Sequence, residues 1–449
     1  MTYPTDTASA PQKTGLRSLI RALRHRNFRL FFIGQSISLV GTWMQRIALG
    51  WLIYRLTNSE FLLGLVGFVG QAPTLLLGPF AGVLADRWNR HRLIVATQVV
   101  AMLQALVLAL LVLTHTVTVW QIIVLGALLG VVNAFDMPAR QTFMIEMLDD
   151  KDDLGNAIAL NSSIVNGARL LGPSIGGILI AAVGEGICFL LNGLSYIAVI
   201  AGLLMMRLAI KETAPHRSKV WQELKDGIAY AAGNVPIRSI LSMLALISLV
   251  GMPYTVLMPV FAKDILLGGP RVLGFLMGAV GLGALGGAVY LASRKTVLGL
   301  GRMIPIAATI FGLSLAAFAF SHVLWISLPL MLFTGFGQMV QMASSNTLLQ
   351  TIVDDDKRGR VMSLYVTAFM GMVPIGSLLA GLLASRIGAP WTVFAGGVAC
   401  IIGAGLFARN LPVLRKAIRP IYVSKGILPE IALGIQSADE PGLPDKNRK

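Results

Sequence analysis

The amino-acid sequence predicts an all-α membrane protein with twelve transmembrane helices, arranged as two six-helix bundles. Three observations predict this class. Of the 449 residues, 55% are hydrophobic and only 13% are charged, whereas soluble domains carry about 25% charged residues. The apolar residues form runs of roughly the 20 residues that a helix needs to cross a bilayer. A polar segment in the middle of the chain separates six of these runs from the other six.

The runs are too long for transmembrane strands, and they lack the alternation of polar and apolar residues that such strands require. Each run therefore predicts a helix. In chain order, the predicted spans are 28–56, 61–85, 93–113, 119–148, 154–183, 187–206, 237–262, 272–293, 303–320, 324–353, 361–385 and 391–407.

The segments outside the spans complete the predicted organisation. The N-terminal arm has apolar residues at helical spacing with arginines between them, a pattern that favours contact with a membrane surface. Residues 221–232 have the pattern of an interfacial helix. The predicted divisions are a basic arm at 1–27, a bundle at 28–207, a linker at 208–236, a second bundle at 237–411 and a C-terminal tail at 412–449.

The distribution of basic residues predicts the orientation in the membrane. Most of the 37 Lys and Arg fall in the two terminal segments and in the loops on the same side as the termini. Cytoplasmic loops carry this excess, so both termini are expected in the cytoplasm, with the chain in the cell membrane. The same bias accounts for the net charge of +16. A nucleic-acid partner is not expected, because no basic patch with interleaved aromatic residues accompanies the charge.

Short internal matches indicate that the two halves are a parallel repeat. The sequence Ile-Ser-Leu-Val-Gly occurs at 37–41 and again at 247–251. Leu148-Asp149-Asp150, after the fourth span, is matched by Val353-Asp354-Asp355 after the tenth. In transporters, such repeats place the binding site near the middle of the membrane, between the halves.

A charged turn joins the second and third spans. Its distinctive residues are Gly82, Asp86, Arg87, Arg90 and Arg92. The glycine allows close packing, and the arginines hold the turn in the cytoplasmic headgroup region. Asp86 can pair with Arg87 or Arg90, or accept hydrogen bonds from the N-terminus of a neighbouring helix such as the one near Gly359. The alternative is a solvated loop with no further role.

Polar side chains inside the spans are candidate functional groups, because exposing them to lipid is costly. They share faces at helical spacing in the first, fourth, fifth and tenth spans. These faces either line a central cavity or join helices through hydrogen bonds. The candidates for a cavity that binds substrate are Arg46, Asn133, Asn166, Arg169, Gln338 and Gln341.

Asp136 is the candidate for proton coupling. It is the carboxylate placed well inside a span, and no histidine lies at that depth. Proton antiport needs a group that takes up and releases a proton. Asp136 precedes Arg140 by four residues, so the two can form an ion pair on one helix face. Such pairing would keep the carboxylate ionised at neutral pH and oppose the coupling role.

Glycines within two of the predicted spans allow either close packing of neighbouring helices or bending of their own helix. Gly172-Pro173 and Gly176-Gly177 lie within the fifth span, and residues 371–374 of the eleventh span also contain a glycine and a proline. We expect both places to interrupt their helices, either as packing contacts or as hinges. Cys188 and Cys400 lie in apolar runs and predict neither a disulfide nor a metal site.

These motifs together resemble the major facilitator superfamily. The 82–92 turn is similar to the motif that joins its second and third helices, and the Gly-Pro stretch with Arg169 resembles a motif of its antiporters and exporters. The stretch 133–140 resembles the exporter branch that includes the enterobactin exporter and macrolide efflux relatives. The resemblance implies that Asp86 is a latch that holds one conformation, and that the Gly172-Pro173 bend seals one side against leakage.

The expected function is secondary active export of a small organic compound, siderophore-like or drug-like, by alternating access. A proton gradient is the expected driving force, with no cofactor, because the chain lacks a phosphate-binding loop for ATP. A lipid bilayer and a small molecule are the expected partners of a monomer. The alternatives are an uptake carrier and a non-transporting sensor or scaffold. An enzyme is disfavoured because no Ser-His-Asp set, metal cluster or long catalytic loop is present.

Overall fold

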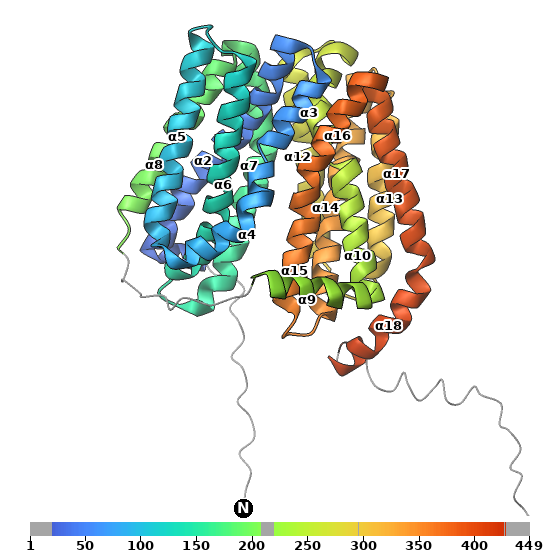
Figure 1. The fold of residues 1–449 in the computed structure, drawn as a ribbon. Coiled ribbons are helices and arrows are strands. Elements are labelled where there is room, and N and C mark those ends of the chain that lie inside the picture. Colours follow the sequence, from blue (N-terminus) through green and yellow to red (C-terminus); the bar gives the residue numbers. More distant parts are fainter. Residues whose placement is uncertain (1–19, 208–219, 295, 426, 428–449) are drawn as a thin grey trace, which may run out of the picture. The chain divides into compact units, whose positions relative to one another are not determined.

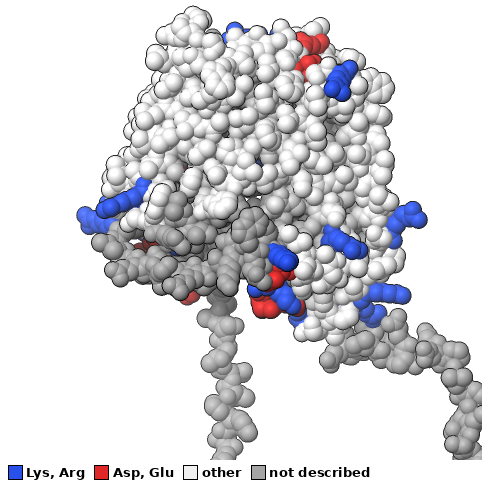
Figure 2. Space-filling view, viewed as in Figure 1, with Lys and Arg blue, Asp and Glu red and all other residues white. Residues whose placement is uncertain are grey.

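The computed structural model describes residues 20–207, 220–294, 296–425 and 427; within these ranges, the side chains of 79, 82–87, 151 and 220–224 are not described. All regular secondary structure in the described residues is helical (Figure 1). Eleven helical stretches there are long and apolar enough to cross a membrane. The remaining predicted span, 28–56, coincides with α2, which Gln35, Gln45 and Arg46 make less apolar. On the face shown in Figure 2, most of the described surface is uncharged, and Lys, Arg, Asp and Glu side chains are few.

Close packing divides the chain into two units. The first contains residues 1–56 and 76–216, and the second contains residues 57–75 and 217–449. The helices assigned to the first unit are η1 (Arg21–Arg24), α2 (Arg26–Thr57), α4 (Ala72–Arg87), α5 (Arg90–Leu113), α6 (Val119–Glu146), η2 (Lys151–Asp153), α7 (Leu154–Val183) and α8 (Glu185–Leu204). The first residues of α4 fall in the second unit.

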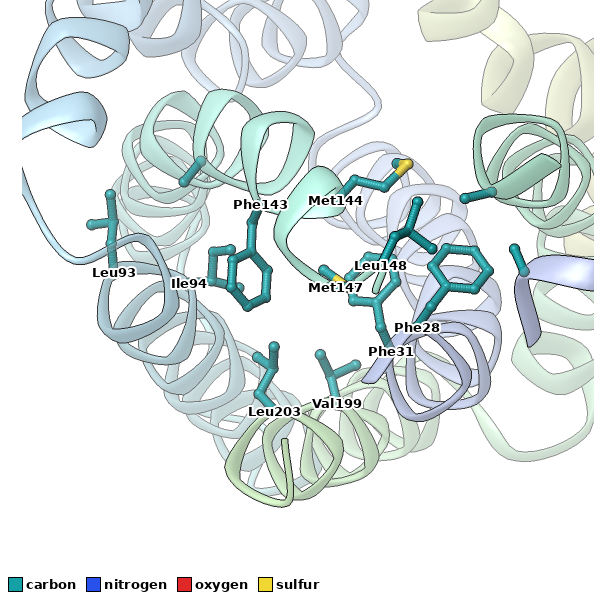
Figure 3. Close-up of a cluster of buried hydrophobic side chains, with 13 residues drawn as sticks. Phe28, Phe31, Leu93, Ile94, Phe143, Met144, Met147, Leu148, Val199 and Leu203 are labelled. Carbon is teal, nitrogen blue, oxygen red and sulfur yellow. The ribbon is translucent and has the colours of Figure 1, made fainter. Parts of the chain in front are cut away.

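In the first unit, α5 packs against α6 and α8, and α7 packs against α8. One apolar cluster contains residues of α2, α5, α6, α7 and α8 and lies near the start of α2 (Figure 3). Phe28 comes from α2, Ile94 from α5, Phe143 from α6 and Leu203 from α8, and all four are buried. Because lipid is as apolar as these side chains, tight packing and not the hydrophobic effect holds such helices together.

The second unit contains most of the C-terminal half. Its helices are α3 (Glu60–Val69), α9 (Val220–Gly233), α10 (Val235–Leu246), η3 (Ile247–Gly251), α11 (Tyr254–Val260), η4 (Phe261–Ile265), α12 (Gly269–Ala292), α13 (Leu300–Phe318), α14 (Leu324–Ile352), α15 (Arg358–Val366), η5 (Thr367–Gly371), α16 (Met372–Ile387), α17 (Ala389–Arg409) and α18 (Leu411–Ser424). The main contacts are α12 with α14, α14 with α13, α13 with α17, and α3 with α16.

The second predicted span differs most from the expected single helix. Helix α3 ends at Val69, and α4 begins at Ala72, with Pro73 in its first turn. Proline is tolerated there but cannot donate to the preceding turn, so the chain restarts a helix at this point. The α3 part packs on α16, where Gly64 lies so near Gly381 that an added Cβ would come within 2.8 Å of its Cα.

The remaining differences concern helix type and length. The seventh span contains the π-helical segments η3 and η4, and the eleventh contains η5, directly before the expected break at 371–374. The helix predicted at 221–232 is present as α9, and its place at the membrane interface stays a prediction. The predicted C-terminal tail, in contrast, begins with helix α18, which buries Leu414, Ile418 and Tyr422. Periodic apolar residues on a short basic segment were the signal that could have found it.

The repeated acidic loops have corresponding surroundings in the two units. In the second unit, Asp354 accepts a hydrogen bond from Tyr230 of α9 at 3.2 Å, and Arg360 lies 3.8 Å from Asp226. In the first unit, the loop at 149–153 contacts η1. Thus a helix that precedes the first span of each half is attached to the loop after its fourth span, in agreement with the predicted repeat.

Candidate functional site

The charged turn lies where α4 ends and α5 begins. Helix α4 continues to Arg87, and Asn89 caps α5 by accepting a hydrogen bond from the backbone of Arg92 at 3.0 Å. The Arg92 side chain is exposed, as expected for a residue in a headgroup region. The surroundings of Gly82 and the side chains of Asp86 and Arg87 lie outside the described part of the chain, so the role of Asp86 as a latch stays a prediction.

Arg90 has a partner that the sequence did not indicate. Its Nη1 atom donates to Oε1 of Glu146 at 2.6 Å, and the arginine side chain is 15% exposed. Glu146 is the last residue of α6, so this ion pair joins the charged turn to the end of the fourth span. The sequence suggested Asp86 as the partner of Arg90, because the two are near in the chain. It also placed the end of the fourth span at residue 148, beyond Glu146. Pairing across 56 residues depends on how α5 packs on α6.

Asp136 is held by three donors within the first unit. Thr97 and Gln98 of α5 donate to its Oδ1 atom at 2.9 and 2.8 Å. Arg140 of the same helix forms the expected ion pair with Oδ2. The carboxylate is buried, and these hydrogen bonds satisfy both of its oxygen atoms. The group therefore joins α5 to α6 in this conformation, and its proton-coupling role stays a prediction.

Arg46 and Arg169 approach the same indole ring. The guanidinium carbon of Arg46 lies 4.8 Å from the centroid of Trp43, and that of Arg169 lies 5.8 Å from it. Trp43 and Arg46 belong to α2, whereas Arg169 belongs to α7. The structure thus brings together two predicted cavity residues from different spans. Sequence reasoning missed Trp43, although an aromatic residue one turn before an arginine inside a span is a recognisable signal.

The other predicted cavity residues are dispersed. Asn133 of α6 is half-buried, and the half-buried Asn166 donates to the carbonyl oxygen of Ser162 in its own helix at 2.9 Å. Gln338 and Gln341 are buried in the second unit. The first donates to Sδ of Met252 at 2.7 Å, and the second donates to Oγ of Ser345, one turn along α14, at 3.2 Å. Their part in substrate binding stays a prediction.

A buried amide network joins three helices of the first unit. Gln45 of α2 donates to Gln104 of α5 at 3.2 Å and accepts from Asn192 of α8 at 2.6 Å. All three side chains are buried. Sequence reasoning did not name them, although each is an amide inside an apolar run and so carries the same signal as the named residues. Their hydrogen bonds fix the packing of α2 close to Trp43 and Arg46.

The Gly-Pro motif is a packing contact between α7 and α2. Helix α7 continues through Pro173 to Val183, so the expected interruption at this place is wrong. Neighbouring turns can re-satisfy backbone groups freed by a proline inside a membrane helix. A Cβ added at Gly172 would lie 2.5 Å from Cβ of Trp43, and one at Gly176 would lie 3.0 Å from Met44. Gly177 and Pro173 are also buried.

A second ionic cluster attaches η1 to the loop before α7, outside the spans. Arg21 forms an ion pair with Asp153, and Arg24 lies 2.9 Å from the same carboxylate. His25 is hydrogen-bonded to Asp149 at 3.0 Å and to Asp153 at 2.8 Å. Asp153 is fully buried. The sequence predicted an arm that approaches the membrane, but it did not predict these partners.

The cluster makes stability depend on pH. Burial lowers the pKa of His25, but the hydrogen bonds and charges of Asp149 and Asp153 outweigh it and raise the pKa above 6.5. Burial likewise raises the pKa of Asp153, but His25, Arg21 and Arg24 lower it below 3.8. The contribution of His25 to the stability of the folded protein is therefore complete below pH 6.5, and it is lost as the pH rises through the folded-state pKa of His25. The contribution of Asp153 to stability is present above pH 3.8, and it is lost as the pH falls through the folded-state pKa of Asp153.

We expect His25→Gln to destabilise the first unit by about 1–3 kcal/mol at acidic pH and by less at alkaline pH, because the neutral imidazole of the native protein loses its charge-assisted bonds. Thermal unfolding of both proteins in detergent, measured from about pH 5.5 to about pH 9, checks this. A difference between them that does not change over this range would contradict the assignment.

Solved structures define the class of the fold. A bacterial homologue of the human lysosomal transporter Spinster, in an inward-facing conformation, has a TM-score of 0.69 and 13% sequence identity, and the match covers 88% of this chain and 98% of that one. The nucleoside transporter NupG has a TM-score of 0.67 at 13% identity, with 87% and 99% covered. At these identities the similarity concerns the fold alone. The chain is a multi-spanning membrane protein with the major facilitator fold.

The family follows from the sequence. Residues 18–424 match the model of the family described as transmembrane secretion effector, within the major facilitator superfamily. The chain belongs to this family. The match includes every predicted span and confirms the resemblance that the turn and Gly-Pro motifs indicated.

Three relatives are similar over most of their length. The staphyloferrin A transporter of Staphylococcus aureus is 28% identical over 375 residues, which are 83% of this chain and 93% of the relative. The multidrug efflux pump Tap of Mycolicibacterium fortuitum is 27% identical, with 82% and 92% covered. The macrolide efflux protein A of Streptococcus pyogenes is 24% identical, with 81% and 92% covered. The family and these relatives are transporters, so the chain is a membrane transporter for a small molecule and not an enzyme.

Proposed function

We propose that the protein is a proton-coupled exporter of a small organic compound and works by alternating access as a monomer in the cell membrane. The observation that carries the proposal is the similarity, over 81–83% of the chain, to transporters that are described as efflux proteins or as carrying a siderophore. The siderophore and the macrolide named for those relatives give two candidate cargo classes. The basic residues near both ends of the chain support cytoplasmic termini.

Direction of transport is tested by accumulation in cells. Cells that express the protein are compared with cells that carry the empty vector, using a panel of siderophores and macrolide-like compounds. We expect lower accumulation of at least one compound in the expressing cells. Higher accumulation would identify an uptake carrier instead. Accumulation that does not change for any compound would support a non-transporting sensor or scaffold.

Asp86 is proposed as the gate residue of the charged turn. Its backbone lies in the last turns of α4, next to a turn whose Arg90 is already bound by Glu146. A carboxylate there can accept hydrogen bonds from a helix N-terminus in one conformation and release them in the other. Alternating access would then depend on this single acid, because the corresponding segment of the second half, 292–295, has none.

We expect Asp86→Asn to lower the transport rate about tenfold or more, because a neutral amide loses a charge-assisted interaction of about 1.5–3 kcal/mol in one conformation only. Efflux is measured at matched protein levels. Accessibility of an introduced cysteine to a polar thiol reagent reports the change in conformation, and the native Cys188 and Cys400 are both buried. If the transport rate and the cysteine labelling are both unchanged, the turn is a solvated loop without a role in gating.

Proton coupling is proposed to involve Asp136. In the described conformation, Thr97, Gln98 and Arg140 contact its two oxygen atoms. We propose that these donors move away from the carboxylate in the opposite conformation, where it takes up a proton. This arrangement would link uptake of a proton to the conformational change. If Asp136→Asn retains proton-driven transport with an unchanged pH profile, the carboxylate has only a structural role.

A further inference from the structure

We propose that Trp43, Arg46 and Arg169 form a subsite for an anionic group of the transported compound, and that substrates are selected by negative charge. This inference rests on the proposed transport function and specifies its substrate class. The shared ligand chemistry is a carboxylate or a similar anion attached to a flat apolar body. The guanidinium groups bind the anion, and the indole contacts the apolar part.

The first argument is the concentration of positive charge on one aromatic ring. Both guanidinium carbons lie within 5.8 Å of the Trp43 centroid, and they come from different spans. The face of an indole attracts cations but does not neutralise them. Two like charges in a low-dielectric environment repel each other. A bound anion beside Arg46 would relieve this repulsion, whereas a cationic compound would increase it.

The second argument is that Arg46 differs from three other arginines of the first unit, which each have a carboxylate partner. Arg55 is bound by Glu185 at 2.7 Å, Arg90 is bound by Glu146, and Arg140 is bound by Asp136. Among the described residues, no carboxylate lies within 4.0 Å of Arg46. Its side chain is exposed although it lies well inside α2. An arginine at such a depth faces the interior of a bundle or a water-filled space, because exposure to lipid is costly.

The third argument is the local packing that places the ring. Gly172 lies one turn after Arg169 on α7, and the absence of a Cβ there allows α7 to contact Cβ of Trp43 and the carbonyl of Val40. This close approach brings Arg169 to the ring that α2 carries. We therefore assign Gly172 as a positioning residue of the subsite. The Gly-Pro motif, in this account, sets the distance between the two arginines.

The test measures binding to the full-length protein in lipid nanodiscs by the change in tryptophan fluorescence. The probes are 2-naphthoate, the neutral 2-naphthamide and the cationic 2-naphthylmethylamine, which share a ring system and differ in charge. We expect 2-naphthoate to bind the native protein more tightly than the other two, and Trp43→Phe to remove the signal. Trp120→Phe is the control, because Trp120 is an exposed residue of α6. Equal affinities for the three probes would overturn the proposal.

Substitutions then assign the contacts. We expect Arg46→Gln and Arg169→Gln each to weaken 2-naphthoate binding about tenfold or more and to leave 2-naphthamide unchanged. Arg46→Lys keeps the charge but loses the planar fork, so an intermediate loss is expected. Gly172→Ala is expected to reduce the preference for the anion. Gly155→Ala on the same helix is the control, because a Cβ there has no neighbour within 4 Å. Unchanged anion preference in Arg46→Gln would overturn the proposal.

Two further comparisons distinguish a substrate anion from a lipid headgroup, and failure of the subsite from failure of the transport function. Nanodiscs of phosphatidylcholine are compared with nanodiscs that contain phosphatidylglycerol. Competition by the anionic lipid would identify a headgroup site and overturn the substrate assignment. Flux is measured separately on the same variants. Efflux whose charge selectivity is the same in Arg46→Gln would overturn the subsite while the transport function stands. Anion binding without any flux would support the subsite and contradict the transport function.

Discussion

Replacing Asp136 by Asn is expected to lower the free energy of unfolding of the first unit by about 3–5 kcal/mol, because it leaves the guanidinium of Arg140 without its buried carboxylate partner. The same change weakens the bonds from Thr97 and Gln98 that attach α5 to α6. Thermal unfolding of the purified protein in detergent measures the loss, and we expect a clearly lower midpoint together with a lower yield of folded protein.

The control for this prediction is a double-mutant cycle. Arg140→Gln alone should also destabilise the unit, whereas Asp136→Asn with Arg140→Gln should be less destabilised than the sum of the single changes, because no unpaired charge remains. Additive losses would show that the two residues act independently. A midpoint in Asp136→Asn equal to that of the native protein would contradict the structural account of this carboxylate.

Replacing Gly283 by Ala is expected to destabilise the second unit by about 3 kcal/mol or more, because the added Cβ has no space at the crossing of α12 and α14. It would lie 2.9 Å from the backbone nitrogen of Phe336 and closer still to the carbonyl oxygen of Leu332. These are backbone atoms, so the two helices would have to separate. Thermal unfolding and the retention time of the folded protein on gel filtration check the result.

Gly286, on the same helix, provides the matched control. A Cβ added there has no heavy atom within 4 Å. Alanine is the better helix former, so Gly286→Ala is expected to leave the midpoint unchanged or to raise it slightly. If Gly283→Ala and Gly286→Ala unfold at the same temperature, the close approach of α12 and α14 is not what holds the second unit together.

Much of the architecture could be predicted because hydropathy acts locally. An apolar run of sufficient length must form a helix in lipid, where every backbone group needs a partner within its own segment. The expected ion pair between Asp136 and Arg140 followed from the spacing of one helix, and it is confirmed. Helix α9 was likewise recognised from its own pattern. Features that depend on one segment could be found from the sequence.

Features that depend on packing between segments could not be predicted in this way. The choice of Glu146 as the partner of Arg90 requires α5 and α6 to be placed side by side. Contact of Trp43 with both Arg46 and Arg169 requires the close approach of α2 and α7. The break between α3 and α4 and the π-helical segments change only a few backbone hydrogen bonds within continuous apolar runs. A hydropathy profile averages over such local changes.

The central proposal is tested most directly by substrate flux across sealed vesicles that contain the purified protein, with and without an imposed pH gradient. The panel contains siderophores and macrolide-like compounds, and the Asp86→Asn protein is measured beside the native one. We predict movement of at least one anionic compound that follows the gradient, stops when a protonophore dissipates it, and falls strongly in the variant. Flux of the native protein that is the same with and without the gradient would contradict proton-coupled export.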